Sequence, residues 1–335
     1  MTLLRPPDIA RNDRPSGDGL TSDMVRIPGG TFRMGSDRFY PEESPVHEAT
    51  VDGFWMNIGP VTNAEFQAFV GATGYVPVAE RTPDPADYPG IDPDLLIPGS
   101  LVFRRPVRRI AVQDPTAWWV YMAGACWKQP EGPGSSIRGR EQHPAVHVAY
   151  EDAEAYAAWA GKAIPSEAEW EFAARGGLDG ADFAWGNEPL PDGRHLANTW
   201  QGEFPWQNLT IDGYEGTSPV GAFPANGYGL LDMIGNVWEW TRDAYHVRRA
   251  PRAASPCCAP GNPMQELTDP CLASAGSRGA IPRKVVKGGS HLCAPNYCLR
   301  YRPAARQGEN IDTSTCHIGF RCVMRPQAEG ASPDR

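Results

Sequence analysis

The sequence has no basic run and no long apolar run, and both absences narrow the possible functions. Asp and Glu number 40 against 31 Lys and Arg, which gives the 335-residue chain a formal net charge of -9. An acidic chain without a Lys/Arg cluster offers no surface suited to nucleic-acid phosphates. No apolar stretch approaches the ~20 residues that a membrane-spanning helix needs. We therefore expect neither a nucleic-acid partner nor a membrane partner.

Cysteine is also scarce, whereas glycine and proline are abundant. Eight cysteines in a chain of this length are too few for a fold held together by disulfides. The 36 glycines and 34 prolines interrupt the backbone often, which predicts many loops and short elements instead of long helices. No internal repeat or parallel βαβ series is visible. The fold class predicted from these features is α+β and loop-rich.

The composition changes at the two ends of the chain. Residues 1–23 contain no hydrophobic run and lack the apolar core of a secretory signal, which predicts a disordered lead-in and a cytoplasmic protein. Residues 24–326 are predicted to form a single domain, which is long enough to bury a sizeable core. Residues 327–335 are predicted to be a flexible tail.

Local patterns predict a hairpin and the limits of two helices. Residues 25–35 alternate apolar and polar side chains around two adjacent glycines, as a hairpin does. Capping-box patterns at residues 62–65 and 166–169 each predict the start of a helix. Glycines in residues 71–74 and at 176–177 predict where these two helices end.

A further helix and a long loop are predicted between these elements. Residues 151–161 have helical periodicity, with Ala155, Ala158 and Trp159 on the face expected to be buried. Residues 82–100 are rich in Pro and Asp and predict a long loop, which is often a functional feature.

Four of the eight cysteines lie in residues 284–322, KVVKGGSHLCAPNYCLRYRPAARQGENIDTSTCHIGFRC. Cys293 and Cys298 are surrounded there by tyrosines and arginines. Cationic surroundings favour the thiolate, which is the form that attacks electrophiles or binds metal. This segment is therefore the leading candidate for a site.

Residue types alone leave four interpretations of the Cys293/Cys298 pair open. A structural zinc site needs four ligands, and no second pair lies at a suitable spacing. A disulfide would close a very small loop, which constrains the unfolded chain little. A redox dithiol is more often C-x-x-C beside a βαβ unit. The fourth interpretation is a Cu(I) site, because soft thiolate ligands select that ion.

This segment resembles the C-terminal signature of the formylglycine-generating enzyme (sulfatase-modifying factor) family. The resemblance extends to earlier motifs in the same order. They are IPGGTFRMGS at residues 27–36, VTNAEFQAFVGATGYV at 61–76, WWVYMAGACWKQPEGPGSSI at 118–137 and HPAVHVAYEDAEAYAAWAGKAIPSEAEWEFAARGGL at 143–178. The resemblance covers roughly residues 25 to 325. It implies a variant of the C-type-lectin fold with little regular secondary structure.

The activity implied by this resemblance is oxidation of a protein cysteine. A copper-dependent, oxygen-using oxidase would convert a cysteine in a sulfatase Cys-x-Pro-x-Arg-type motif to Cα-formylglycine. The implied partners are an unfolded sulfatase polypeptide or peptide, molecular oxygen and an external thiol reductant. Cys293 and Cys298 would bind Cu(I), and Ser290 would act beside the metal-bound atoms. The implied substrate-binding residues are Ser100, Trp238, Arg302 and His317.

The resemblance also implies two structural calcium sites. Turns rich in Asp and Asn supply the oxygen ligands that Ca²⁺ accepts, although such residues are equally ordinary in turns. Asp232 stands where family members usually have Asn, which retains an oxygen ligand and adds charge. The ligands of the first site would be Asn198, Thr199, Asp212 and Tyr214, and those of the second Asp232, Gly235, Val237 and Glu239.

Departures from the family pattern raise the question of substrate choice. Asn296 replaces a common Ser, Glu309 and Ile311 replace Asn and Pro, and His317 stands where an Asn lines the active site. A copper enzyme of the same fold acting on a different thiol substrate is therefore one alternative. The other is a non-catalytic lectin-like binding module, although family members of that kind usually lack the cysteine pair.

The remaining cysteines and His147 receive simpler interpretations. Cys257, Cys258 and Cys271 lie in an insertion that better-known members lack, either as incidental surface thiols or as a second metal or redox site. The resemblance implies that Cys316 and Cys322 are free. His147 lies between two valines and is expected to be a satisfied core or turn residue without a catalytic role.

Overall fold

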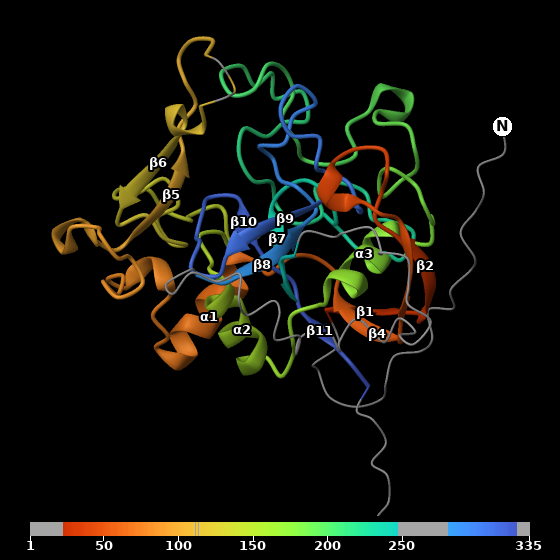
Figure 1. Cartoon of the computed structure of the whole chain (residues 1–335), viewed down its shortest axis with the longest axis horizontal. Coiled ribbons are helices and arrows are strands. Elements are labelled where there is room, and N and C mark those ends of the chain that lie inside the picture. Colours follow the sequence, from red (N-terminus) through yellow and green to blue (C-terminus); the bar gives the residue numbers. More distant parts are fainter. Residues whose placement is uncertain (1–22, 111, 113, 247–280, 327–335) are drawn as a thin grey trace, which may run out of the picture.

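The computed structural model describes residues 23–110, 112, 114–246 and 281–326. Within these residues the helices are few and short, and Figure 1 shows them around a small central sheet between two strand-containing flanks. The α-helices are α1 (Asn63–Thr73), α2 (Tyr150–Trp159) and α3 (Glu167–Arg175). The strands are β1 (Met24–Ile27), β2 (Gly30–Met34), β3 (His47–Val51), β4 (Phe54–Asn57), β5 (Gly99–Phe103), β6 (Trp119–Ala123), β7 (Trp238–Ala244), β8 (Arg283–Lys287), β9 (Arg306–Asn310), β10 (Ile318–Gly319) and β11 (Val323–Met324).

The strands pair into one four-stranded sheet, one three-stranded sheet and two hairpin-like pairs. The four-stranded sheet has the order β10-β7-β8-β9, with β7 and β10 parallel and the other pairs antiparallel. The three-stranded sheet has the order β1-β4-β11, and β2-β3 and β5-β6 form the two pairs. Short 3₁₀ turns connect the strands at Pro41–Glu43, Val78–Glu80, Pro93–Leu95, Pro115–Ala117 and Pro191–Gly193.

The predicted hairpin over residues 25–35 is wrong. Both segments are strands, but β1 pairs with β4 and β2 pairs with β3. Gly29 lies between β1 and β2, where a Cβ would approach Gly53 N to 2.8 Å. The alternating pattern identified the strands, but it carries no information about which strand each one pairs with.

Helices α1 and α3 confirm the predictions made from capping boxes. The Glu65 carboxylate accepts a hydrogen bond from Thr62 N at 2.7 Å, while Thr62 Oγ1 accepts one from Glu65 N at 3.3 Å. Helix α1 ends at Gly74, which has a φ of 68°. Because glycine adopts this left-handed conformation without a Cβ clash, it ends a helix readily. Helix α3 has the same arrangement and ends at Gly176.

The buried face predicted for the second helix is wrong. In α2, Tyr150, Ala153 and Tyr156 are buried, whereas Ala158 and Trp159 are exposed. The ring of Tyr156 packs edge-on against Phe69 and Phe320, with centroids 5.6 and 5.2 Å apart. The helix is rich in alanine on all sides, so small side chains define no apolar stripe and the large aromatic rings determine the face.

The core between the sheets and α3 contains ion pairs as well as apolar side chains. Trp170 of α3 and Trp240 of β7 are both fully buried. Lys287, also fully buried, binds Glu171 Oε2 at 2.8 Å. Buried charges need such partners because they have lost their hydration. These pairs fix the end of β8, after which the cysteine-containing segment begins.

Some of the sequence predictions concern residues that the structure does not describe. Cys257, Cys258 and Cys271 lie outside the described residues, as do residues 1–22 and 327–335. Across the part of the chain that is described, no helix is both long and apolar enough to span a bilayer. Cys126, Cys316 and Cys322 are free thiols in this structure, as the resemblance implied for the latter two.

We predict that Ser166→Ala lowers the free energy of unfolding by about 1 kcal/mol, the usual cost of losing an N-cap hydroxyl. Ser166 Oγ accepts the hydrogen bond of Glu169 N at 3.1 Å at the start of α3. Urea unfolding monitored by circular dichroism measures the change. Ser136→Ala is the matched control, because this serine is exposed and begins no helix. Equal stabilities of the two variants would contradict the capping role.

Candidate active site

Two adjacent glycines position the cysteine-containing loop. Gly288 and Gly289 follow β8 and have φ values of 92° and 70°, which favour glycine. A Cβ on Gly289 would lie 2.8 Å from the backbone of Arg300, and one on Gly288 would lie 2.9 Å from Met233 O. The loop can therefore turn tightly against the chain that returns from Cys298 only because both side chains are absent.

The turn brings the two thiols together. Cys293 N donates to Ser290 O at 2.9 Å, and Cys298 N donates to Ala294 O at 2.8 Å. The two Sγ atoms lie 3.2 Å apart, and both cysteines are free and buried. Ser290 N donates to Cys293 Sγ at 3.4 Å. Five residues of separation in the sequence have thus become direct contact between the sulfurs.

The two thiols differ in acidity because their surroundings differ. Burial raises the pKa of Cys293 well above its ordinary value, and the neighbouring Cys298 adds to this effect. The pKa of Cys298 is lowered to about 7, first by the hydrogen bond from Cys293 and then by the nearby Arg300 guanidinium. Arg300 Nη1 lies 3.8 Å from Cys298 Sγ. The pair therefore favours a state with one thiolate, located on Cys298.

Arg300 is held in place by residues from the N-terminal part of the chain. Its Nη2 donates to Glu42 Oε1 at 2.5 Å, and its guanidinium stacks 3.8 Å from the centroid of the Tyr40 ring. Tyr40 Oη also accepts a hydrogen bond from Leu299 N at 2.9 Å. Because Arg300 lies two residues after Cys298, its role beside the thiol could have been predicted from the sequence. Nothing in the sequence indicates Glu42, which lies 258 positions away.

A pocket of about 260 Å³ opens over the two sulfurs. Aromatic and aliphatic side chains form much of its wall, and a few polar groups face it. Of the residues predicted from the sequence, it brings together Cys293, Cys298, Ser290, Trp238 and His317. The remaining lining residues are Leu101, Trp118, Trp119, Phe204, Leu292, Tyr297, Arg300, Gln307, Glu309, Thr313, Thr315 and Ile318.

His317 occupies the pocket wall as a neutral ring. Its Nδ1 lies 2.6 Å from Thr315 Oγ1, and its ring packs 4.9 Å from that of Trp119. Burial lowers the pKa of His317 to about 3, so the imidazole is uncharged at neutral pH. The carbonyl of His317 accepts the hydrogen bond of Trp238 N at 2.8 Å, which joins the two predicted substrate-binding residues.

Ser100 and Arg302, to which the resemblance assigns substrate binding, are not among the residues that line this pocket. Ser100 is 1% exposed, and its Oγ binds Ser314 O at 2.6 Å and His147 Nδ1 at 2.7 Å behind β5. Arg302 is likewise 1% exposed, and its Nη1 donates to Glu43 Oε2 at 2.8 Å. Each side chain is held by its own partners, and Arg302 lines a different pocket.

The thiol pair fits the donor chemistry expected for Cu(I). Two adjacent sulfur ligands match a soft monovalent ion. The described residues contain no group of three or more His, Cys, Asp or Glu arranged to hold a metal. The donor set at Cys293 and Cys298 therefore has two protein ligands, fewer than the four of a structural zinc site.

The first predicted calcium site contains oxygens suited to a cation. Asn198 Oδ1 and Asp212 Oδ2 are both buried and without a hydrogen-bond partner. The side chain of Gln201 connects their loops, because its Nε2 donates to Thr199 O and its Oε1 accepts from Asp212 N at 3.1 Å. Unsatisfied buried oxygens are costly, and a hard cation would satisfy both.

The second predicted calcium site does not fit in the same way. Glu239 Oε2 accepts from Trp170 Nε1 and from Arg321 Nε, both at 2.7 Å, and Oε1 accepts from Arg321 Nη2 at 2.8 Å. Asp232 Oδ2 accepts from Gly221 N at 2.7 Å. The carboxylate of Glu239 is thus neutralised by a buried arginine, which leaves no uncompensated charge for calcium at that position.

Comparisons with known proteins agree in family and fold. The family described as sulfatase-modifying factor enzyme 1-like domain matches residues 11–326. A formylglycine-generating enzyme of Mycobacterium tuberculosis is 52% identical over 308 residues, which cover 92% of this chain and 99% of that protein. A Bos taurus protein named inactive C-alpha-formylglycine-generating enzyme 2 is 38% identical, with 93% and 92% of the two chains covered. The structure of PvdO from Pseudomonas aeruginosa aligns with a TM-score of 0.56 at 25% identity and covers 90% of this chain and 94% of that one.

We predict that Arg300→Gln raises the pKa of Cys298, because it removes the positive charge 3.8 Å from the sulfur. In the metal-free protein, iodoacetamide labelling of Cys298 should have a midpoint near its pKa of about 7. The midpoint should move to higher pH in the variant. Peptide mass spectrometry identifies the labelled cysteine. Arg194→Gln removes an exposed charge elsewhere and should leave the midpoint unchanged; an unchanged midpoint in both variants contradicts the role of Arg300.

We predict that Glu239→Gln lowers the free energy of unfolding by about 3–5 kcal/mol, because it leaves a buried arginine without its counter-ion. Arg321 is fully buried. Urea unfolding should show the same loss with excess calcium and with a chelator. A loss that appears only in calcium would instead make Glu239 a calcium ligand. Glu48→Gln, at an exposed position of β3, is the matched control.

Proposed function

This chain belongs to the formylglycine-generating enzyme (sulfatase-modifying factor) family, and on that premise we propose that it converts a protein cysteine to Cα-formylglycine. The substrate would be an unfolded sulfatase segment of the Cys-x-Pro-x-Arg type. The observation that carries this proposal is the contact between Cys293 Sγ and Cys298 Sγ at 3.2 Å beneath an open pocket. Non-catalytic members usually lack this cysteine pair, so its presence favours an enzyme.

We propose that Cys293 and Cys298 hold Cu(I). Each supplies a sulfur ligand, and the thiolate character of Cys298 reduces the number of protons that must leave when the ion binds. A bound Cu(I) ion would supply the redox chemistry by which molecular oxygen oxidises a thiolate. The substrate cysteine would enter the pocket from above the two sulfurs.

The overall reaction requires a reductant in addition to oxygen. A cysteine side chain, one O₂ and two external thiols yield an aldehyde, hydrogen sulfide, a disulfide and water. Cβ loses one hydrogen and its bond to sulfur and gains a double bond to oxygen. Oxygen accepts four electrons, two from the substrate carbon and two from the external thiols. We therefore propose an external thiol as the second electron donor.

The pocket residues position the substrate and limit access by water. Trp119, Trp238 and Leu101 contribute apolar walls, and such walls strengthen polar contacts within the pocket. Ser290 lines the pocket beside Cys293, where its backbone N donates to Cys293 Sγ at 3.4 Å and its Oγ accepts from Leu292 N at 3.2 Å, so we propose that it orients the cysteine-containing turn. Holding the reacting groups together in this volume is the main contribution that the protein makes to the rate.

A different thiol substrate is the second candidate, favoured by the polar part of the pocket wall. Glu309 and His317, which depart from the usual family residues, both line the pocket. Gln307 Nε2 donates to Glu309 Oε1 at 2.5 Å, which fixes the carboxyl group. The preferred substrate of a pocket with a carboxyl group at this position would have different residues flanking its thiol from the preferred substrate of a pocket with an amide there.

We also propose a structural Ca²⁺ ion at the first of the two predicted sites. The buried oxygens of Asn198 and Asp212 support it. The cytoplasmic location expected from residues 1–23 stays a prediction, since it depends on composition alone.

We predict that Cys293→Ala and Cys298→Ala each abolish turnover, because each removes one of the two sulfur ligands. A Cys-x-Pro-x-Arg peptide is incubated with the copper-loaded protein, a thiol reductant and air. The aldehyde product is trapped with a hydroxylamine and identified by mass spectrometry. Cys126→Ala is the matched control, because it removes a buried thiol outside the pocket and should retain activity. Full activity in either pocket variant would rule out the proposed ligation.

The same experiment separates the alternatives. Copper binding that depends on both cysteines, without turnover of the peptide, would support a different thiol substrate. Failure of the wild-type protein to bind Cu(I) would favour a binding module instead. Copper binding can be followed by competition with a chromogenic Cu(I) chelator, which reads ligation independently of activity.

A further inference from the structure

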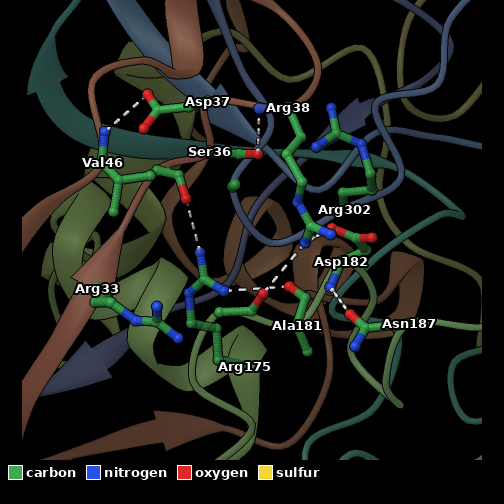
Figure 2. A pocket seen from close by; sticks show the side chains of 13 residues that line it. Arg33, Ser36, Asp37, Arg38, Val46, Arg175, Ala181, Asp182, Asn187 and Arg302 are labelled. Atoms are coloured by element: carbon green, nitrogen blue, oxygen red, sulfur yellow. Dashed lines mark hydrogen bonds and ion pairs between the residues drawn. The ribbon is translucent and has the colours of Figure 1, made fainter.

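A second pocket, of about 350 Å³, is lined by a different set of residues from the thiol pocket. It shares no lining residue with the thiol pocket. Figure 2 shows arginines that reach it from separate segments, together with Asp37, Asp182 and Asn187. Its lining residues are Arg33, Gly35, Ser36, Asp37, Arg38, Val46, Arg175, Gly180, Ala181, Asp182, Asn187, Arg302 and Ala304. Nothing in the proposed oxidation uses this pocket.

Two arginines at its rim have guanidinium N–H groups that are available to a ligand. Arg33 Nε binds Asp179 Oδ2 at 3.0 Å, and among the described residues its two terminal nitrogens form no hydrogen bond. Arg38 Nη2 binds the Asp182 carboxylate and donates a second hydrogen bond to Gly180 O at 3.4 Å. Their side chains remain 61% and 58% exposed. Each guanidinium is therefore oriented by one carboxylate on one edge and open to a ligand on another.

The loop around Gly180 shapes the rim. Gly180 has a φ of +74°, and a Cβ there would overlap Arg33 Nη2. The guanidinium of Arg33 can lie against this loop because the glycine has no side chain. Asn187 Oδ1 accepts from Asp182 N at 3.0 Å, which leaves the amide nitrogen of Asn187 as a further donor at the pocket wall.

A third arginine forms the floor. Arg175 is 3% exposed, and its terminal nitrogens donate to Ala181 O and Gly35 O, both at 3.2 Å, and to Glu171. Its Nε is buried and has no hydrogen-bond partner. Buried donors are nearly always satisfied, and this unpaired Nε–H leaves part of the positive charge of Arg175 uncompensated beneath the pocket.

The two carboxylates of the lining are each held by protein donors, and one edge of each rim guanidinium stays open. Asp37 Oδ1 accepts from Ser44 Oγ at 2.7 Å and from Val46 N at 3.2 Å. Asp182 pairs with Arg38. We propose that this pocket binds a small organic phosphate, with Arg33 and Arg38 as its donors and Arg175 as a cation beneath them. Guanidinium groups match the geometry of phosphate oxygens, and the volume leaves room for an organic group.

The test measures binding directly and does not depend on the proposed oxidation. Isothermal titration calorimetry of the full chain is carried out with glycerol 2-phosphate, with inorganic phosphate and with malonate, a dianion without phosphorus. Saturable one-to-one binding of glycerol 2-phosphate is expected. Arg33→Gln combined with Arg38→Gln should weaken it by about tenfold or more, since hydrogen bonds to charged groups are lost. Both side chains are exposed, so the fold should persist, and circular dichroism checks this.

The matched control is Arg108→Gln combined with Arg194→Gln. These arginines line neither pocket, and their removal lowers the net charge by the same amount. The control should bind glycerol 2-phosphate with unchanged affinity. Absence of saturable binding to the wild type, equal weakening in both double variants, or malonate binding as tight as that of glycerol 2-phosphate would each overturn the proposal.

Discussion

Two adjacent carboxylates, Glu42 and Glu43, hold the segment on which both pockets depend. Glu42 binds Arg300, and Glu43 binds Arg302. The second pair is almost fully enclosed, with side-chain exposures of 1% and 0% for Arg302 and Glu43. A buried charge without its partner is strongly unfavourable, so the chain after Cys298 has little freedom to move away. The position of the Cys298 sulfur is thus constrained by the turn that carries Glu42 and Glu43.

The same segment separates two chemically different pockets. Arg300 lines the thiol pocket, whose wall combines aromatic, aliphatic and polar side chains, and Arg302 lines the arginine-rich pocket. In the first pocket, a single cation stabilises one thiolate. In the second, guanidinium groups oriented by carboxylates leave donors open. One short stretch of backbone therefore supports a site suited to soft-metal chemistry and a site suited to an oxyanion.

The elements that the sequence predicted well are those specified by neighbouring residues. The capping boxes at Thr62 and Ser166 set the starts of α1 and α3, because both partners of each box lie within one turn. The face of α2 and the pairing of residues 25–35 were predicted wrongly. Alanine-rich helices and short alternating strands carry little information about their partners, so Tyr156 and the β3-β4 strands decided these features.

By itself the sequence determined the family, the loop-rich α+β class and the cysteine pair, because long motifs and a five-residue separation are properties of the chain alone. Only the tertiary structure decided which predicted residues share a pocket. It placed His317 and Trp238 in the pocket that holds the sulfurs, and it buried Ser100 of β5 against Ser314 and His147. It also brought Glu42 to Arg300, since contacts between distant segments arise from packing in three dimensions and leave no local pattern.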